Sequence, residues 1–151
     1  MRERFCILVV DDDDVDTALI RRAFKQNGFT NPLQTARHGE EALDILRRGI
    51  GPGASERDLP GLILLDLNMP VLSGVELIRQ LKGHPQLRSI PVVVLTTSDA
   101  EADLAETYRL GIAGYIVKPL EFSKFVDAVQ TLGYYWSMCA RPQRGFATLP
   151  S

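Results

Sequence analysis

The sequence predicts an α/β fold in which an open parallel β-sheet is covered by helices on both faces. Short continuous apolar runs, typical of strands buried on both faces, alternate with segments whose apolar residues recur every three or four positions. Right-handed crossovers between such strands place helices over the sheet. The chain has 151 residues, which is long enough for one core, because a domain of about 150 residues buries roughly 68–70% of its unfolded surface.

Five segments are expected to be strands. Four are continuous apolar runs, and the second segment in the chain is weaker and follows a proline. A stretch that begins with several glycines and prolines is expected to form a flexible loop before the third strand. The strands are expected at residues 5–10, 33–36, 62–65, 90–95 and 115–117, and the loop at residues 49–60.

Helices are expected between the strands and after the last one. Gly28 is expected to end the first helix at a C′ position, and Gly111 the fourth. Ser73 precedes Glu76 at the spacing of a capping box and opens the third helix, and Ser98 repeats the pattern in the fourth. The inward-facing apolar residues are Val15, Leu19, Ala23 and Phe24 in the first helix, Ala42, Leu43, Ile45 and Leu46 in the second, Val75, Leu77, Ile78 and Leu81 in the third, and Phe122, Phe125, Val126 and Val129 in the fifth, which begins near Glu121.

The composition is that of an ordinary globular protein. A formal net charge of -2 with 24% charged residues gives no excess of positive charge for a polyanion, so nucleic acid is not an expected partner. The first apolar run is too short for a signal-peptide core or a membrane span, so a cytoplasmic location is expected. Cys6 is expected to be a small buried hydrophobe, and with Cys139 as the second of two cysteines a disulfide framework is not expected.

Polar and charged residues follow the apolar runs at the points where strands are expected to end. Asp11 and Asp12 follow the first run, Asp66 the third, Thr96 the fourth and Lys118 the fifth. In an open α/β sheet, ligands bind beyond the carboxyl ends of the strands, near the point where strand order reverses. We therefore expect three carboxylates, one hydroxyl and one ammonium group to meet at one edge of the sheet.

Clustered carboxylates repel one another and favour a hard, oxygen-seeking divalent cation such as Mg²⁺. Such a cation can bridge a carboxylate nucleophile and an incoming phosphoryl group, whose other oxygens Lys118 and Thr96 can contact. Asp66 is the favoured nucleophile, because it stands alone after a central strand. The Asn68-Met69-Pro70 turn that follows can aim a backbone carbonyl at the same cation.

Four separated motifs carry a resemblance to response regulator receiver domains of two-component signalling. They are Ile7-Leu-Val-Val-Asp-Asp12, Leu64-Leu-Asp-Leu-Asn-Met-Pro70, Val94-Leu-Thr96 and Tyr115-Ile-Val-Lys-Pro119. The resemblance covers residues 5–130 and implies a flavodoxin-like, doubly wound sheet of five parallel strands in the order 2-1-3-4-5, with five helices. The receiver is expected to span residues 1–137, followed by a tail at 138–151.

The resemblance also implies roles for individual residues. Asp66 is implied as the phosphoacceptor, Asp12 as a direct Mg²⁺ ligand, Asp11 as a ligand through water and Asn68 as a ligand through its backbone carbonyl. Thr96 is implied to bind the phosphoryl group.

Two further implied roles concern the last strand. Tyr115 is implied to rotate into the space that the loop after Thr96 vacates. Lys118 is implied to pair with a phosphoryl oxygen and to precede a cis proline, Pro119. Considered alone, Thr96 could be an ordinary strand residue and Tyr115 an ordinary core aromatic. Their placement together with the other residues of the expected site favours the functional roles.

The histidines and the late aromatic residues point toward partners. His38 and His84 are expected at surface loops or helix ends, so the phosphoryl donor's histidine must come from another protein. Tyr134, Tyr135 and Trp136 are consecutive, so in a helix they point in different directions and cannot all face the protein core. Either the tail from Ser137 folds over them or they form a dimer or kinase interface.

The expected function is a signalling switch without an output domain, because few residues follow Lys118. Its phosphoryl donor is expected to be a sensor histidine kinase or a histidine phosphotransfer protein. The late aromatics and the long loop at residues 49–60 resemble single-domain regulators paired with bacterial phytochrome-type kinases. Phosphorylation is expected to change the surface of the fourth helix, fifth strand and fifth helix, which could also form a homodimer.

Two other functions remain open from the residues themselves. A phosphohydrolase of the haloacid dehalogenase class needs a second acid two residues after the nucleophile, where this chain has Asn68. Turnover of phosphomonoesters is therefore expected to be absent, and the chain is expected to be a switch limited to self-phosphorylation and slow self-dephosphorylation rather than an enzyme. A flavodoxin-like cofactor binder or an unphosphorylated pseudo-receiver is the other alternative, although residues 11–14 are all acidic and would repel a cofactor phosphate.

Overall fold

The computed structural model describes residues 6–54, 58–69, 72–96, 101–118 and 121–138. Within these residues the chain alternates regularly between strands and helices, as the sequence predicts. The elements are β1 (Ile7–Val10), α1 (Asp14–Gln26), β2 (Leu33–Ala36), α2 (Gly39–Arg48), β3 (Leu62–Asp66), α3 (Gly74–Lys82), β4 (Val92–Thr96), α4 (Glu101–Leu110), β5 (Gly114–Val117) and α5 (Phe122–Met138). No helix in this part of the chain is long and apolar enough to span a bilayer.

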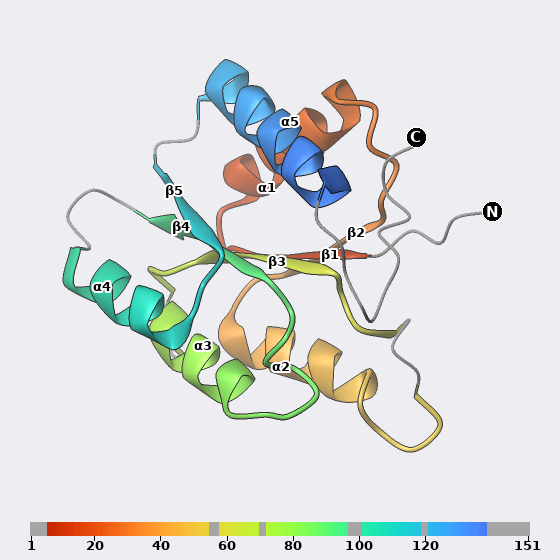
Figure 1. The fold of residues 1–151 in the computed structure, drawn as a ribbon, viewed down its shortest axis with the longest axis vertical. Coiled ribbons are helices and arrows are strands. Elements are labelled where there is room, and N and C mark those ends of the chain that lie inside the picture. The colour runs from red at the N-terminus through yellow and green to blue at the C-terminus, as the bar shows by residue number, and fades with distance from the viewer. Residues whose placement is uncertain (1–5, 55–57, 70–71, 97–100, 119–120, 139–151) are drawn as a thin grey trace.

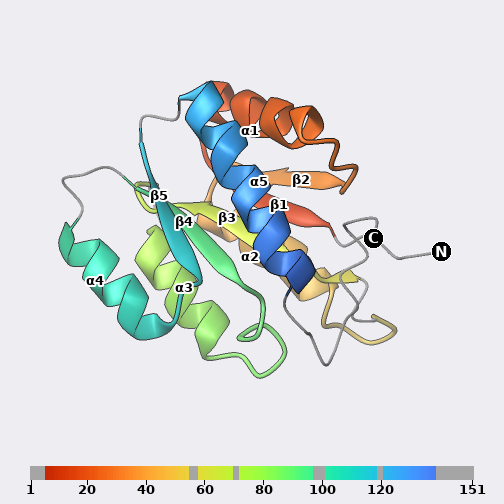
Figure 2. The same ribbon diagram turned by 45° about the horizontal axis from the view of Figure 1, so that its top comes forward.

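The described strands form one five-stranded parallel sheet in the order β2-β1-β3-β4-β5, which confirms the expected topology. Helices α1 and α5 cover one face, and α2, α3 and α4 lie on the other (Figures 1 and 2). Each face has its own apolar core: Ile20, Phe24 and Phe125 belong to the first, and Leu46 and Leu77 to the second. The sheet is therefore the middle layer of three.

The three central strands β1, β3 and β4 are buried along their whole length, as expected for strands covered on both faces. The same expectation is wrong for β5, whose Tyr115 is 43% exposed and Val117 48% exposed. The reason is position: β5 is an edge strand paired only with β4 among the described strands, so its outward residues are only partly covered. Cys6 is likewise only partly buried, because it precedes β1 rather than lying within it.

Helix ends follow the expected local rules. Asp13 caps α1 by accepting a hydrogen bond from the Val15 N–H at 2.8 Å, and Ser73 caps α3 by accepting one from the Glu76 N–H at 3.2 Å. Gly28 and Gly111 have positive φ angles of 74° and 93° after α1 and α4, which confirms both as helix stops.

Both histidines lie where the sequence places them, at helix ends. The Nδ1 atom of His38 caps α2, and His84 accepts a hydrogen bond from the Gln86 N–H in the turn after α3.

Three expectations fall on parts of the chain that the structure does not describe. They are the cap at Ser98, the peptide bond before Pro119 and the tail at residues 139–151. Helix α5 includes residues 134–136 in its backbone, but their side chains lie outside the described set, so their role stays a prediction.

Candidate functional site

Strand order reverses between β1 and β3, since the chain passes from β1 outward to β2 and then returns to β3 on the other side of β1. Asp11 directly follows β1, and Asp66 is the last residue of β3. Thr96 ends β4, and Lys118 directly follows β5. All four positions lie at the carboxyl edge of the sheet, where ligands of open α/β folds bind.

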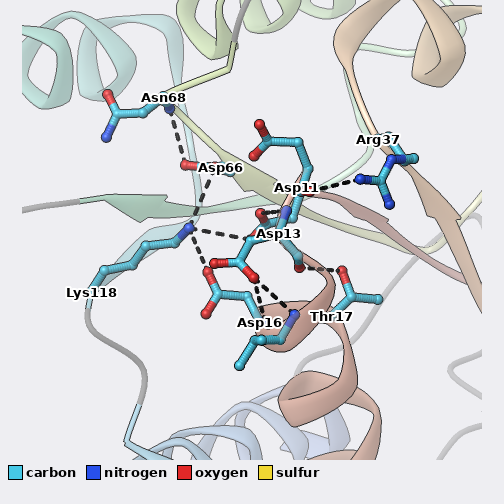
Figure 3. A network of polar contacts seen from close by, with 10 residues as sticks. Asp11, Asp13, Asp16, Thr17, Arg37, Asp66, Asn68 and Lys118 are labelled. Carbon is cyan, nitrogen blue, oxygen red and sulfur yellow. Dashed lines mark hydrogen bonds and ion pairs between the residues drawn. The ribbon is translucent and has the colours of Figure 1, made fainter.

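The Asp66 side chain is nearly buried, with 4% of its surface exposed. Its Oδ1 atom accepts a hydrogen bond from the Asn68 N–H at 3.0 Å, and its Oδ2 atom lies 3.4 Å from Lys118 Nζ. Burial raises the pKa of Asp66 above its ordinary value, although the Asn68 N–H and the Lys118 charge oppose the shift. Figure 3 shows the contact between the Asp66 carboxylate and the lysine.

Asp11 is completely buried at its side chain and lies next to Asp66. Its Oδ1 atom accepts a hydrogen bond from the Asp13 N–H at 2.9 Å, and its Oδ2 atom lies 3.3 Å from Lys118 Nζ. Burial, with smaller contributions from the charges of Asp66 and Asp16, raises the pKa of Asp11 from 3.8 to about 6. In the absence of a bound cation, ionisation of the Asp11 carboxylate at neutral pH therefore lowers the stability of the folded protein.

The Lys118 ammonium group is the positive charge of this cluster. Among the described residues it contacts three carboxylates, at 2.7 Å to Asp16, 3.3 Å to Asp11 and 3.4 Å to Asp66 (Figure 3). Burial alone would lower its pKa, but the hydrogen bond to Asp16 and the charges of all three carboxylates outweigh burial and raise it. The Lys118 N–H donates to the Thr96 carbonyl oxygen at 2.7 Å, which fixes the backbone of the lysine against β4.

Asp16 is a further partner of Lys118 that the sequence does not identify. It lies in the first turn of α1, and its carboxylate makes the shortest contact to Lys118. The available signal was weak: an acid in the first turn of a helix is common because it favours the helix dipole. Only the packing of α1 beside the end of β5 reveals its partner.

One carboxylate oxygen from each of Asp11, Asp12 and Asp66 lies within 4.8 Å of the other two. Two of these side chains are buried and one, Asp12, is exposed, so the group opens to solvent on one side. Such a donor set fits a hard divalent cation that keeps several waters, as Mg²⁺ does. We call Asp11, Asp12, Asp66 and Lys118 the acidic site.

The other residues singled out from the sequence surround this site. Thr96 is buried with 1% exposure at the end of β4, while Asn68 is exposed beyond the end of β3. The ring of Tyr115 is outward-facing and packs edge-on against Tyr108, with 5.8 Å between the ring centroids. Thr96 and Tyr115 lie on neighbouring strands, because β4 pairs with β5.

The fold and site together define the class: a flavodoxin-like α/β protein with an acidic edge at the topological switch point whose carboxylates could hold a cation. The sequence matches the family described as the response regulator receiver domain over residues 7–130, so the chain belongs to that family. A receiver domain is a signalling switch of two-component systems. Family membership therefore favours a switch over the phosphohydrolase and the flavin-binding alternatives.

Relatives support this assignment along most of the chain. The probable methanogenesis regulatory protein FilR2 of Methanothrix harundinacea is 42% identical over 132 residues, covering 87% of this chain and 83% of the relative. The crystal structure of the phosphorylated cyanobacterial phytochrome response regulator RcpA has a TM-score of 0.78 at 36% identity, covering 92% of this chain and 98% of that chain. The Mn²⁺-bound form of response regulator Rcp1 has a TM-score of 0.74 at 31% identity, covering 97% and 99%.

Proposed function

We propose that this protein is switched by phosphorylation of Asp66. The observation that carries the proposal is the environment of the Asp66 Oδ2 atom. This oxygen faces Lys118 Nζ at 3.4 Å, while the backbone N–H of Asn68 binds the other oxygen, Oδ1. One carboxylate oxygen of Asp66 also lies within 4.8 Å of carboxylate oxygens from Asp11 and Asp12. A nucleophilic oxygen beside a fixed ammonium group and a cation-binding cluster is the arrangement that phosphoryl transfer requires.

The reaction balances as a simple displacement. A carboxylate oxygen of Asp66 attacks the phosphorus of the donor, forming a P–O bond. The bond from phosphorus to the donor's histidine nitrogen, or to acetate when acetyl phosphate is the donor, breaks and its electron pair leaves with that group. Lys118, whose Nζ atom lies 3.4 Å from Asp66 Oδ2, would neutralise charge on a phosphoryl oxygen. Attack by water later returns orthophosphate and the Asp66 carboxylate.

Asp11, Asp12 and Asp66 would hold the Mg²⁺ ion, with Asp11 acting through water and Asn68 through its backbone carbonyl. When bound, the ion would neutralise negative charge on the phosphoryl oxygens and offset the repulsion among the carboxylates. The raised pKa of Asp11 supports this assignment, because an unneutralised buried carboxylate is unfavourable. The Mn²⁺-bound form of Rcp1 is a related protein that carries a divalent ion.

Thr96 and Tyr115 are proposed as the residues that pass the change to the surface. Thr96 would bind the phosphoryl group through its hydroxyl, and Tyr115 would rotate from its outward position into the space vacated beside it. The starting point is consistent with this, since Tyr115 is 43% exposed and touches Tyr108 of α4. The surface of α4, β5 and α5 would then differ between the two states.

A sensor histidine kinase is the proposed phosphoryl donor, directly or through a histidine phosphotransfer protein. The likeness to RcpA, a phytochrome response regulator, favours a phytochrome-type kinase. The same α4, β5 and α5 surface is the proposed contact for a downstream partner or a second copy of the chain. We assign the receiver to residues 1–137, the tail to 138–151 and the protein to the cytoplasm.

Intact-mass measurement after incubation with acetyl phosphate and Mg²⁺ tests the proposal. Wild-type protein should gain the mass of one phosphoryl group, and omission of Mg²⁺ should prevent the gain. Asp66→Asn is the matched control, because it keeps the size of the side chain and removes the nucleophile. An unmodified wild type, or equal labelling of Asp66→Asn, would rule the proposal out.

A further inference from the structure

Asp16 contributes a carboxylate to Lys118 from outside the ends of the strands. Its Oδ2 atom lies 2.7 Å from Lys118 Nζ, closer than the carboxylates of Asp11 at 3.3 Å and Asp66 at 3.4 Å. Figure 3 shows Asp16 below the lysine, on the side away from Asp66. Both partners are largely shielded from water, with side-chain exposures of 15% for Lys118 and 16% for Asp16. Water therefore screens this contact less than it screens a typical pair at the surface.

The ammonium group of a lysine has three donors, and three carboxylates surround it within the described residues. A phosphoryl oxygen on Asp66 can bind Lys118 only by taking a donor from one of them or by sharing it. Asp11 and Asp66 belong to the group whose oxygens lie within 4.8 Å of one another, so a cation bound there would offset their charges. Asp16 is outside that group, so such a cation would not offset the negative charge that attracts its carboxylate to Lys118.

Lys118 does not need Asp16 in order to reach the site. Its backbone N–H is already fixed to the Thr96 carbonyl at 2.7 Å, and Asp11 and Asp66 also contact its ammonium group, at 3.3 and 3.4 Å. The Asp16 contact instead draws the ammonium group toward α1. Its effect on a phosphoryl oxygen attached to Asp66 is that of a rival acceptor.

We propose that Asp16 competes with the phosphoryl group on Asp66 for the Lys118 ammonium group and so weakens the phosphorylated state. This inference rests on the proposed function of Asp66. Asp16 acts through Lys118 and does not touch the reacting atoms, so it is a positioning residue. It sets how much of the lysine's charge is available to the phosphoryl group.

Titration with beryllofluoride, a non-covalent mimic of the phosphoryl group, tests the inference at equilibrium in the presence of Mg²⁺. Asp16→Asn keeps the size of the side chain and removes its charge, so it should bind beryllofluoride about fivefold more tightly than wild type, the factor set by ~1 kcal/mol. Its labelled fraction with limiting acetyl phosphate should rise as well. Asp16→Glu restores a carboxylate and should return the affinity toward that of wild type.

Asp14→Asn is the matched control. Asp14 lies in the same turn of α1, its side chain is 84% exposed and it pairs with Arg37 rather than with Lys118. The substitution removes the same charge and should change beryllofluoride affinity far less than Asp16→Asn does. Circular dichroism and urea unfolding of each variant establish that all are folded.

The outcomes separate this inference from the proposed function. If wild type is labelled on Asp66 but Asp16→Asn binds beryllofluoride no more tightly than wild type, competition by Asp16 is wrong and the phosphoacceptor assignment stands. An equal gain in Asp14→Asn would show a general charge effect and would also overturn competition. If wild type is not labelled at all, the proposed function itself fails.

Discussion

Replacement of Asp11 by Asn should make the metal-free protein more stable at neutral pH, although it removes a residue of the acidic site. The Asp11 side chain is fully buried beside the Asp66 carboxylate, and its contact to Lys118 only partly offsets the loss of water. Asn is nearly the same size and carries no charge. Its side-chain oxygen can still accept the 2.9 Å hydrogen bond from the Asp13 N–H.

The expected gain follows from the pKa of Asp11, which rises from 3.8 in the unfolded chain to about 6 in the folded protein. Each unit of pKa difference corresponds to about 1.4 kcal/mol of folding free energy. The folded state binds the proton more tightly, so the contribution of Asp11 to stability is fully present below about pH 4 and is lost as the pH rises through about 6. Above that pH the ionised group costs ~3 kcal/mol, a figure that already includes the attraction to Lys118, so we expect a net gain of about 1–3 kcal/mol from the substitution.

Urea unfolding in the presence of a chelator, at about pH 7.5 and about pH 4.5, measures this difference. Asp11→Asn should be more stable than wild type at the higher pH and close to it at the lower pH. Asp127→Asn, at an exposed aspartate of α5, controls for the change in net charge. A destabilised Asp11→Asn protein at the higher pH, or a gain that does not depend on pH, would refute the reasoning.

Three further predictions concern the same edge of the sheet. Lys118→Met should destabilise the metal-free protein by about 3 kcal/mol in urea unfolding at neutral pH, because buried carboxylates lose their cation; an unchanged midpoint would contradict the assigned contacts. Gly74→Ala should cost about 1–3 kcal/mol, because a Cβ atom there would lie 2.7 Å from the Leu67 Cα atom, whereas Gly114→Ala, with nothing within 4 Å, should cost less. Mg²⁺ affinity measured by calorimetry should rise as the pH increases through about 6, since Asp11 must lose its proton; a flat profile would argue against Asp11 as part of the metal site.

The order and type of the elements could be predicted because local signals agree with the fold. Gly28 ends α1 with a positive φ and Ser73 caps α3, both as expected from their neighbours in the sequence. The ends of the strands were less predictable, because an apolar residue indicates burial but does not indicate hydrogen bonding to a neighbouring strand. Ile90 is buried at 5% exposure, yet β4 begins only at Val92, after Pro91. The exposure of Tyr115 depends on β5 being an edge strand, which no local pattern reveals.

The gathering of Asp11, Asp66 and Lys118 could be anticipated, since carboxyl ends of parallel strands meet at one edge. The distances among them could not, because they depend on side-chain directions set by packing. Asp16 shows the limit most clearly. Its carboxylate contacts Lys118 at 2.7 Å across two elements distant in sequence, and an acid in the first turn of a helix has a sufficient local explanation without that contact.

The phosphoacceptor role of Asp66 is the central claim, and reductive trapping tests it most directly. Borohydride reduces an aspartyl phosphate to homoserine, and peptide mass spectrometry then identifies the modified position. After treatment with acetyl phosphate and Mg²⁺, we expect homoserine at position 66, and its absence when Mg²⁺ is replaced by a chelator. Homoserine at Asp11 or Asp12 instead, or no homoserine in a protein that gains phosphoryl mass, would contradict the account.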